Sequence, residues 1–417
     1  MKKNVWILNH YASGMFFSKG GRHYWFAKCL RQEGYEPVVF CANTKHGKKE
    51  HWINSDKLWD ERIAEDIRTP FVFVKARTYE GNGKQRVLNM VDFYLNIKKT
   101  AKEYAEIHGK PDIIIASSVH PLTVLAGEQL AKKFRVPCVC EIRDLWPESL
   151  IEYGILKEES IAVKLLRSLE KKLYIDADSI IFTPGGCYDY IKEQKWEKYV
   201  DKNKVFSINN GTDLEEFRQN CEKYRINDSD LIDKSLFKVI YTGSIRKAYG
   251  LGLLLDTAKH VKDDRVRFLI WGDGDEKEQL EERVKKENIK NVIFKGHVEK
   301  KYVPYIVSKS DLNIDHGTLT RINRFGASEN KIFDYLAAGK PVLFNRPSKY
   351  NPVIMGKAGV AVESGEPEDI AGKIEEFVKI DAGKYEEYCL SAKKTAEEYD
   401  FKKLTEKLID VINRTQE

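Results

Sequence analysis

Short apolar runs alternate with amphipathic helical patterns along almost the whole chain. The runs are rich in β-branched and aromatic residues and end in turns that contain glycine, serine or asparagine, which is typical of buried strands. Strands that alternate with helices form parallel sheets through right-handed crossovers. In the first half of the chain we expect strands at 5–8, 37–42, 71–76, 112–117, 137–142, 179–183 and 204–208.

A second series follows a charged, weakly patterned stretch, and 417 residues exceed one ordinary domain. Its expected strands are 238–243, 267–272, 291–296, 311–315, 341–344 and 359–363. We therefore predict an α/β fold with two doubly wound parallel sheets, one in each domain, and ligands beyond the carboxyl ends of the strands. The last helical pattern, 401–412, could cover the second domain or return to the first. The predicted division is an N-terminal domain over 1–208 joined by the helix 400–417, a linker over 209–235, and a C-terminal domain over 236–399.

Composition limits where such a chain can work. Hydrophobic residues make up 42% and charged residues 32% of the sequence, an ordinary balance for a globular protein. The apolar run at 5–8 is too short for a signal peptide, and no stretch approaches the length of a transmembrane helix. The seven cysteines show neither zinc nor disulfide spacing, which favours reduced thiols in a cytoplasmic protein.

The segment Gly326–Pro341, GASENKIFDYLAAGKP, predicts a short helix with a functional N-terminus. Ser328 is a suitable N-cap, and Gly339 with Pro341 ends the helix. A lysine in the first turn, Lys331, is unfavourable there by about 0.3–1 kcal/mol, so a bound anion would explain it. Asp334, one turn later, could accept both hydroxyls of a ribose. On composition alone, a surface helix in which Lys331 and Asp334 pair with each other is equally consistent.

This segment resembles the donor-binding segment of glycosyltransferase family 4, in the branch that builds bacterial cell-surface polysaccharides. That branch includes N-acetylfucosamine-type and related O-antigen and capsule enzymes. Its pattern reads approximately Ser-Pro-Asn-Lys-hydrophobic-Phe-(Glu/Asp)-Tyr-Met-Ala-Ala-Gly-Lys-Pro. Further segments are similar to the same branch, in the expected order: Gly20–Arg22, Ser117–Thr123, Glu141–Ser149, Asn209–Asp213, Tyr241–Ser244 and Gly272–Gly274.

The resemblance implies a GT-B fold, in which two Rossmann-like domains face each other across a cleft. It implies transfer of a sugar with retention of configuration, by front-face displacement and without a metal ion. The donor is a nucleotide sugar bound as a substrate, with UDP the favoured nucleotide, and no separate cofactor is expected. The acceptor is a glycan or a glycan linked to polyprenyl diphosphate.

Site residues follow from the matched positions. The turn after strand 112–117 carries His120, whose counterpart contacts the donor sugar mainly through its backbone; a structural His-Pro turn is the alternative. We interpret the cluster Glu141–Trp146 as mainly structural. The residues predicted to be catalytic are His120, Arg246, Lys247 and Lys331. The residues predicted to bind the donor are Gly20, Gly21, Gly243, Ser244, Gly272, Ser328, Glu329, Asn330, Lys331 and Asp334. No metal ligand is predicted.

The sequence departs from the family pattern at the donor site. Many members carry two glutamates eight positions apart, and here Gly326 replaces the first, while Glu329 is not a substitute by register. Ser244 and Tyr249 stand where the family often has an arginine and a lysine. We expect Arg246 or Lys247, together with Lys331, to neutralise the diphosphate instead. Charge-assisted hydrogen bonds contribute about 1.5–3 kcal/mol each, so the loss of one should slow transfer about ten- to hundredfold.

Positive charge is concentrated near the start of the chain. Residues 1–110 hold 20 Lys and Arg against 12 Asp and Glu, although the whole chain carries only +6. The segment 43–110 interleaves these cations with aromatic residues. It could contact anionic lipid at the inner face of the cell membrane, or it could be an ordinary solvated loop.

Other functions fit the sequence less well. A nucleotide-sugar 2-epimerase or a phosphorylase-like enzyme of the same architecture would need motifs that do not occur here. A nicotinamide oxidoreductase would carry Gly-x-Gly-x-x-Gly in its first turn. A non-catalytic nucleotide-sugar-binding protein stays possible in principle, whereas no nucleic-acid-binding module is recognisable.

Overall fold

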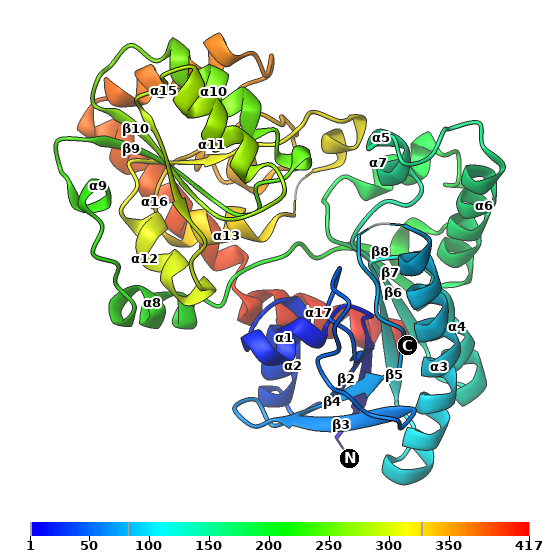
Figure 1. Ribbon diagram of the computed structural model, residues 1–417. Helices are drawn as coiled ribbons and strands as arrows, with labels where there is room; N and C mark the ends of the chain where they lie inside the picture. The colour runs from blue at the N-terminus through cyan, green and yellow to red at the C-terminus, as the bar shows by residue number, and fades with distance from the viewer. Residues whose placement is uncertain (1, 82, 327, 417) are drawn as a thin grey trace. The chain divides into compact units, whose positions relative to one another are not determined.

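The computed structural model describes residues 2–81, 83–326 and 328–416. Four residues lie outside this range: Met1 and Glu417 at the ends of the predicted N-terminal domain, Asn82 in the basic segment, and Ala327 in the predicted donor segment. The chain divides into two compact units. The first runs to Asn209 and includes the chain from Phe401 onward, and the second comprises Asn210–Asp400 (Figure 1).

The first unit is built on an eight-stranded sheet of order β3-β4-β2-β1-β5-β6-β7-β8. Every neighbouring pair is parallel except β3 and β4. Apolar residues occupy both faces of the central strands, because helices cover both sides. The strands are β1 (Asn4–Leu8), β2 (Glu36–Ala42), β3 (Trp59–Ala64), β4 (Thr69–Val74), β5 (Ile113–Ser118), β6 (Cys138–Ile142), β7 (Ser179–Phe182) and β8 (Val205–Ser207).

Helices of the first unit form two layers (Figure 1). Helices α3, α4 and α6 lie along one face of the sheet, and α1, α2 and α17 lie along the other. The last helix packs against α2, where the rings of Phe26 and Phe401 meet edge to face at 5.3 Å. The helices are α1 (Ser13–Ser18), α2 (Arg22–Gln32), α3 (Lys84–His108), α4 (Pro121–Phe134), α5 (Glu148–Glu152), α6 (Ile161–Asp176), α7 (Cys187–Glu193) and α17 (Phe401–Gln416).

The second unit is built on a six-stranded, fully parallel sheet of order β11-β10-β9-β12-β13-β14. Each of its strands was predicted from an apolar run. They are β9 (Phe237–Thr242), β10 (Val266–Trp271), β11 (Val292–Gly296), β12 (Leu312–Asp315), β13 (Val342–Phe344) and β14 (Gly359–Ala361).

Two apolar clusters fill the two faces of this second sheet. One joins the strands to α10 (Leu251–His260), α11 (Lys277–Lys286) and α15 (Pro367–Val378). The other joins them to helices α8 (Leu214–Lys223), α12 (Val303–Ser308), α13 (Asn330–Ala337), α14 (Pro352–Met355) and α16 (Ala382–Glu398). The stretch 209–235, which we expect to link the domains, holds α8 and the short α9 (Ser229–Ile232) within the second unit.

The predicted α/β class with two doubly wound sheets is confirmed. Among the parallel strands of each sheet the order reverses once, between β1 and β5 in the first and between β9 and β12 in the second. Ligands of such sheets bind beyond the carboxyl ends of the strands at this reversal, so these two edges are where a site is expected. Among the described residues, no helix has both the length and the apolar character needed to cross a bilayer.

Candidate active site

The edge at the β9/β12 reversal is formed by backbone loops that approach very closely. Gly243 follows β9, and Gly272 follows the neighbouring β10. A Cβ atom at Gly272 would lie 1.8 Å from the carbonyl oxygen of Gly243, so no larger residue fits without moving the backbone. The two predicted glycines therefore lie side by side and keep this part of the edge free of side chains.

A buried charge network occupies the same edge. The carboxylate of Asp315, the last residue of β12, accepts two hydrogen bonds from Nη2 of Arg346, at 2.7 and 2.8 Å. Arg346 follows β13 and also binds Glu329 through Nη1. Burial alone would raise the pKa of Asp315, but the positive charges of Arg346 and Lys331 outweigh it and lower that pKa. Asp315 is therefore ionised and holds both cations in place.

Lys331 lies inside this network. Its Nζ is 3.2 Å from Oδ1 of Asp315, and its ammonium lies over the rings of Tyr241 and Tyr249, at 4.5 and 4.2 Å. Burial lowers the pKa of Lys331, and the negative charge of Asp315 opposes that shift. The alternative in which Lys331 pairs with Asp334 on a surface helix is wrong, because Lys331 is buried and pairs with Asp315.

The N-terminus of α13 opens onto the same edge. The predicted N-cap is wrong: Glu329 is the N-cap residue, and Ser328 lies outside the helix. The Ser328 hydroxyl instead accepts a hydrogen bond from the amide of Asn210 at 3.1 Å. The side chain of Glu329 does not cap the helix, and no acid stands in its first turn, where Asn330 is exposed. Uncapped amides and the helix dipole at this point favour an anion.

Asp334 lies one turn further along α13, where it is half-buried. Its carboxylate accepts a hydrogen bond from the Thr212 hydroxyl at 3.2 Å. Burial raises the pKa of Asp334, while the positive charge of Lys300 and the bond from Thr212 act against this. The second carboxylate oxygen remains able to accept bonds from a hydroxylated ligand.

Two exposed cations follow β9. Arg246 and Lys247 are exposed, and neither forms an ion pair with any residue that the structure describes. The neighbouring Ser244 contributes its carbonyl to the Tyr241 hydroxyl at 2.7 Å. The positive charges of Lys331 and Arg346 are matched by the negative charges of Asp315 and Glu329. The exposed charges at this edge are Arg246 and Lys247 in the loop after β9, and the carboxylates of Asp273 and Asp275 in the loop after β10.

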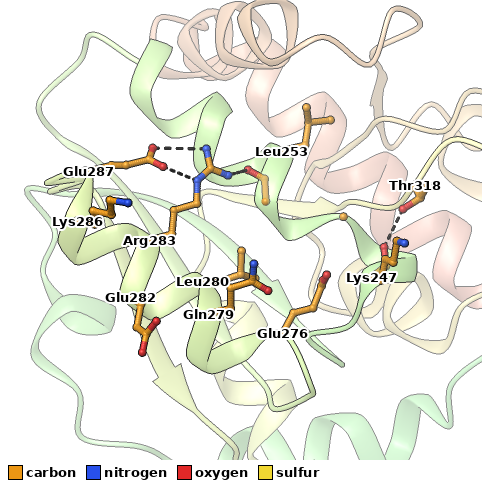
Figure 2. Close-up of a pocket in the computed structure, with 12 residues that line it drawn as sticks. Lys247, Leu253, Glu276, Gln279, Leu280, Glu282, Arg283, Lys286, Glu287 and Thr318 are labelled. Atoms are coloured by element: carbon orange, nitrogen blue, oxygen red, sulfur yellow. Dashed lines mark hydrogen bonds and ion pairs between the residues drawn. The ribbon is translucent and has the colours of Figure 1, made fainter.

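Beside Lys247 a pocket of about 670 Å³ opens between α10, α11 and the loop after β12 (Figure 2). Its volume is within the range of small-molecule sites. Figure 2 shows Arg283 paired with Glu287, and the hydroxyl of Thr318 bonded to the Lys247 carbonyl. Arg283 also donates a hydrogen bond to the carbonyl of Gly252 at 2.9 Å. Among the described residues, Lys247 is the single predicted site residue that lines this pocket.

The corresponding edge of the first unit carries two neutral imidazoles. His10 follows β1, His120 follows β5, and their rings are joined by a 2.6 Å hydrogen bond between Nδ1 of His10 and Nε2 of His120. The ring of His10 also stacks on Phe93 of α3 at 4.4 Å. Burial lowers the pKa of His120 to about 3 and holds that of His10 well below its ordinary value. Both rings are therefore uncharged at neutral pH.

A second buried network of charged side chains lies next to this edge. Glu141 of β6 accepts hydrogen bonds from Arg22 Nε and His23 Nε2, both at 2.8 Å, and from the Ser117 hydroxyl at 2.6 Å. Burial would raise the pKa of Glu141, but Arg22 and His23 hold it well below its usual range. This network fixes the first turn of α2, directly after Gly20 and Gly21, whose backbone lies between α1 and α2.

Sequence reasoning missed several of these residues. Asp315, Arg346 and His10 were not singled out, although each stands at or within two residues of a strand's carboxyl end. That position was a usable signal, because such residues meet at one edge of a parallel sheet. The pairing of His10 with His120, and of Asp315 with Lys331, required the strand order.

Two family descriptions match the chain. "Glycosyltransferase Family 4" matches residues 24–216, and "Glycosyl transferases group 1" matches residues 222–398. The chain is also 25% identical to the probable glycosyltransferase WbjE of Pseudomonas aeruginosa over 183 residues, which are 44% of this chain and 43% of that protein. The aligned part therefore spans less than half the length of this curated relative.

Solved structures are similar to the chain over almost its full length. Sucrose-phosphate synthase from Thermosynechococcus elongatus has a TM-score of 0.73 and 14% identity, covering 99% of each chain. HepE of Anabaena, solved in complex with UDP, has a TM-score of 0.63 and 14% identity, covering 99% of this chain and 100% of that one. At these identities the likeness concerns the fold.

Proposed function

Because the chain belongs to glycosyltransferase family 4 and has the GT-B fold, we propose that it moves a sugar, with retention, from a UDP-sugar to a glycan or to a glycan linked to polyprenyl diphosphate. The sugar is a hexose or an N-acetylhexosamine, and the reaction belongs to cell-surface polysaccharide biosynthesis. The chain's similarity to a probable glycosyltransferase supports the activity, and a relative in fold that was solved with UDP supports the nucleotide.

The observation that carries the proposal is the charged edge of the second sheet. It combines the uncapped N-terminus of α13, the buried ammonium of Lys331 and the exposed cations Arg246 and Lys247. A nucleoside diphosphate needs this combination of amides and positive charge. Asp334 supplies a carboxylate for the ribose hydroxyls. The donor is bound by the C-terminal domain, residues 236–399, and the acceptor by the N-terminal domain.

The site residues take distinct roles in the proposed reaction. Arg246, Lys247 and Lys331 stabilise the negative charge that builds up on the departing diphosphate. The backbone of Gly243, Ser244, Gly272 and Ser328–Asn330 lies against the donor. In the first domain, the His120 turn and the glycines Gly20 and Gly21 offer backbone groups for a sugar, since the His120 side chain is buried against His10.

The chemistry requires few protein acids or bases. The bond from the anomeric carbon to the diphosphate oxygen breaks, and a bond from the same carbon to the acceptor oxygen forms on the same face. The proton of the acceptor hydroxyl passes to the departing phosphate. Stabilisation of the leaving group and placement of the acceptor then account for the rate, and no metal ion takes part.

The test is a thermal-shift panel of nucleotide sugars followed by a transfer assay. We expect one UDP-sugar to raise the melting temperature, and the same compound to release UDP when an acceptor is present. A shift without UDP release would favour a non-catalytic binding protein. Conversion of the donor sugar to an epimer would favour the 2-epimerase alternative, and activity that a chelator abolishes would overturn the metal-independent mechanism.

The proposed lipid-linked acceptor implies that the enzyme works at a membrane. A polyprenyl-linked glycan lies in the inner face of the cell membrane, so the enzyme would work in the cytoplasm as a peripheral membrane protein. We expect salt-sensitive contact with anionic lipid, which the excess of basic residues in the first 110 residues favours.

A further inference from the structure

We propose that the outer face of α6, with the loop before it, docks onto an anionic phospholipid surface. We call this the α6 surface. It consists of Tyr153, Ile155, Lys157, Ile161, Lys164 and Leu165. The inference rests on the proposed function in one respect, because a lipid-linked acceptor gives the surface its use. Its physical basis lies in the exposure and charge of these residues.

The apolar side chains of the α6 surface are unusually exposed. Ile161 is 76% exposed, Leu165 66%, Ile155 57% and Tyr153 52%. Ile161 and Leu165 lie one turn apart, so they share a face of the helix. A helix that covers a sheet normally turns polar residues outward, and α6 already buries Val163, Leu173 and Tyr174 on its inner face. A second apolar strip on the outer face has no role in packing the first unit.

Positive charge lies among these apolar side chains. Lys157 and Lys164 are exposed, and no described residue forms an ion pair with either. Further along the helix, the ammonium of Lys171 lies 3.8 Å from the ring centre of Tyr199, which is itself exposed. The exposed acids Glu158 and Glu159 offset two of these charges. Binding therefore depends on the aliphatic side chains as well as on the lysines.

This combination fits a lipid surface better than a protein partner. The central part of a protein interface is depleted of charged residues, whereas the α6 surface interleaves lysines with isoleucine and leucine. At a bilayer, aliphatic side chains enter the acyl boundary, tyrosine lies at the headgroup level, and lysines reach the lipid phosphates. The α6 surface has all three kinds of side chain.

The position of α6 connects the surface to the first sheet edge. Helix α6 packs against α4, and Figure 1 shows α3, α4 and α6 as one layer along the sheet. A small cavity is lined by His120 and Pro121 at the start of α4 and by Glu170, Leu173 and Tyr174 of α6. The inner face of α6 is therefore in the immediate surroundings of the His120 turn, while its outer face is free to contact lipid.

In the basic segment 43–110, several aromatic side chains are engaged within the first unit, whereas the aliphatic Val87, Leu95 and Ile107 of α3 are exposed. Tyr79 is buried and binds His46, and the Trp59 ring nitrogen donates to Glu103 at 2.9 Å. Arg77 is paired with Asp92 at 2.6 Å. The α6 surface presents its side chains outward, and among the described residues neither Lys157 nor Lys164 has an ion-pair partner of this kind.

Co-sedimentation of the whole protein with vesicles tests the proposal. The probes are vesicles of phosphatidylcholine with phosphatidylglycerol, compared with phosphatidylcholine alone. We expect the wild type to bind the anionic vesicles, less strongly at high salt. The double variant Ile161→Asp/Leu165→Asp should lower this binding at least about tenfold, since it removes two aliphatic contacts and adds two negative charges. Lys157→Glu/Lys164→Glu should weaken the preference for anionic vesicles.

The matched control is Ile232→Asp/Leu390→Asp in the second unit. Ile232 and Leu390 are 52% and 56% exposed, so the same two residue types are changed at similar exposure. We expect this variant to bind vesicles as the wild type does. Equal vesicle binding by the α6 variant and the wild type would overturn the proposal. So would a wild-type dimer that the α6 variant dissociates without any vesicle binding, because the surface would then bind a second copy.

Calorimetric titration with UDP separates this proposal from the proposed function. The α6 variant should keep the wild-type affinity for UDP, since α6 belongs to the other unit. Vesicle binding by a wild type that fails to bind UDP would contradict the proposed function and leave the α6 surface supported. UDP binding by a wild type that ignores vesicles would overturn the α6 surface alone.

Discussion

The two units place different chemistry at the same point of similar sheets. In the first, the reversal between β1 and β5 carries His10 and His120, two buried and uncharged rings joined by a hydrogen bond. In the second, the reversal between β9 and β12 carries the ionised Asp315, with Lys331 and Arg346 bound to it. At the first edge the two rings are uncharged and paired with each other, although the positive charge of Arg86 lies near enough to lower the pKa of both. The other is charged, with Arg246 and Lys247 exposed beside its buried ion pairs.

This difference indicates a division of labour. Neutral imidazoles in a dry environment attract no phosphate, and they hold a backbone turn in shape against which an uncharged sugar can lie. Cations beside a helix N-terminus attract a diphosphate, and the anchoring of Lys331 by Asp315 fixes its position before the ligand arrives. We therefore expect changes at the charged edge to affect the donor, and changes at the neutral edge to leave nucleotide binding intact.

The largest effect is expected at Lys331. In Lys331→Met the donor phosphates lose a cation and Asp315 loses a partner, so kcat/KM should fall about a hundredfold. Lys340→Met, just beyond the same helix, is the control and should keep wild-type activity. Steady-state kinetics with the identified donor measures both. Wild-type turnover in Lys331→Met would remove this lysine from the site.

The close contact of the loops provides the next test. An alanine at Gly272 would place its Cβ 1.8 Å from the Gly243 carbonyl, so the edge must distort, at a cost of about 1–3 kcal/mol in the free energy of unfolding. Gly252→Ala is the matched control: its nearest neighbour, Arg283 Nη1, is 3.5 Å away, and alanine favours the helix. Urea unfolding should separate the two variants. Equal stability would mean that the loops do not pack as described.

Substitution of the exposed cations should have smaller effects, on activity and not on stability. Arg246→Ala and Lys247→Ala are each expected to lower kcat/KM about tenfold. Melting temperature should not change, because both side chains are exposed and neither pairs with a described residue. Lys290→Ala, an exposed lysine of the same unit, is the control. If both variants kept full activity, Lys331 would be the cation that stabilises the diphosphate, and Arg246 and Lys247 would have no part in transfer.

The neutral edge should be visible in the pH dependence of stability. The pKa of His120 in the folded protein is about 3, below its unfolded value of about 6.5. The contribution of neutral His120 to the free energy of unfolding is therefore complete above pH 6.5 and is lost as the pH falls toward 3. Each such proton adds a slope of at most about 1.4 kcal/mol per pH unit. The double variant His10→Asn/His120→Asn should flatten the fall in free energy of unfolding across this window.

Exposed His260 provides the control for that measurement, and His260→Asn should leave the slope as in the wild type. The same slope in the double variant would show that these histidines are not buried in their neutral form. The pH profile of activity between pH 5 and 8 should be the same in the wild type and in the double variant, because neither histidine titrates there.

The sequence allowed the sheets to be predicted far better than the site. Every apolar run expected to form a strand does so, because burial on both faces produces runs that are easy to recognise. The strand that escaped notice is β3, WDERIA, an edge strand paired antiparallel to β4. Only one of its residues is buried, so its polar sequence does not carry the apolar pattern of the others.

The site was predicted in its parts and not in its contacts. Gly339 ends α13 in the left-handed conformation, with a φ of 65°, as the local sequence predicted. Ser328 lies outside the helix, and its hydroxyl accepts a hydrogen bond from Asn210, 118 residues earlier. Likewise, the ion-pair partner of Lys331 is Asp315 on strand β12 and not Asp334 on its own helix, α13. Contacts of this kind depend on strand order, which local patterns do not contain.

The most direct test of the division between the two edges is the affinity for UDP, measured by calorimetry in paired variants. Lys331→Met changes the charged edge, and His10→Asn changes the neutral edge. We expect UDP affinity to fall at least about tenfold in Lys331→Met and to stay at the wild-type value in His10→Asn. Unchanged affinity in Lys331→Met, or an equal loss in both variants, would contradict the assignment of the diphosphate to the charged edge.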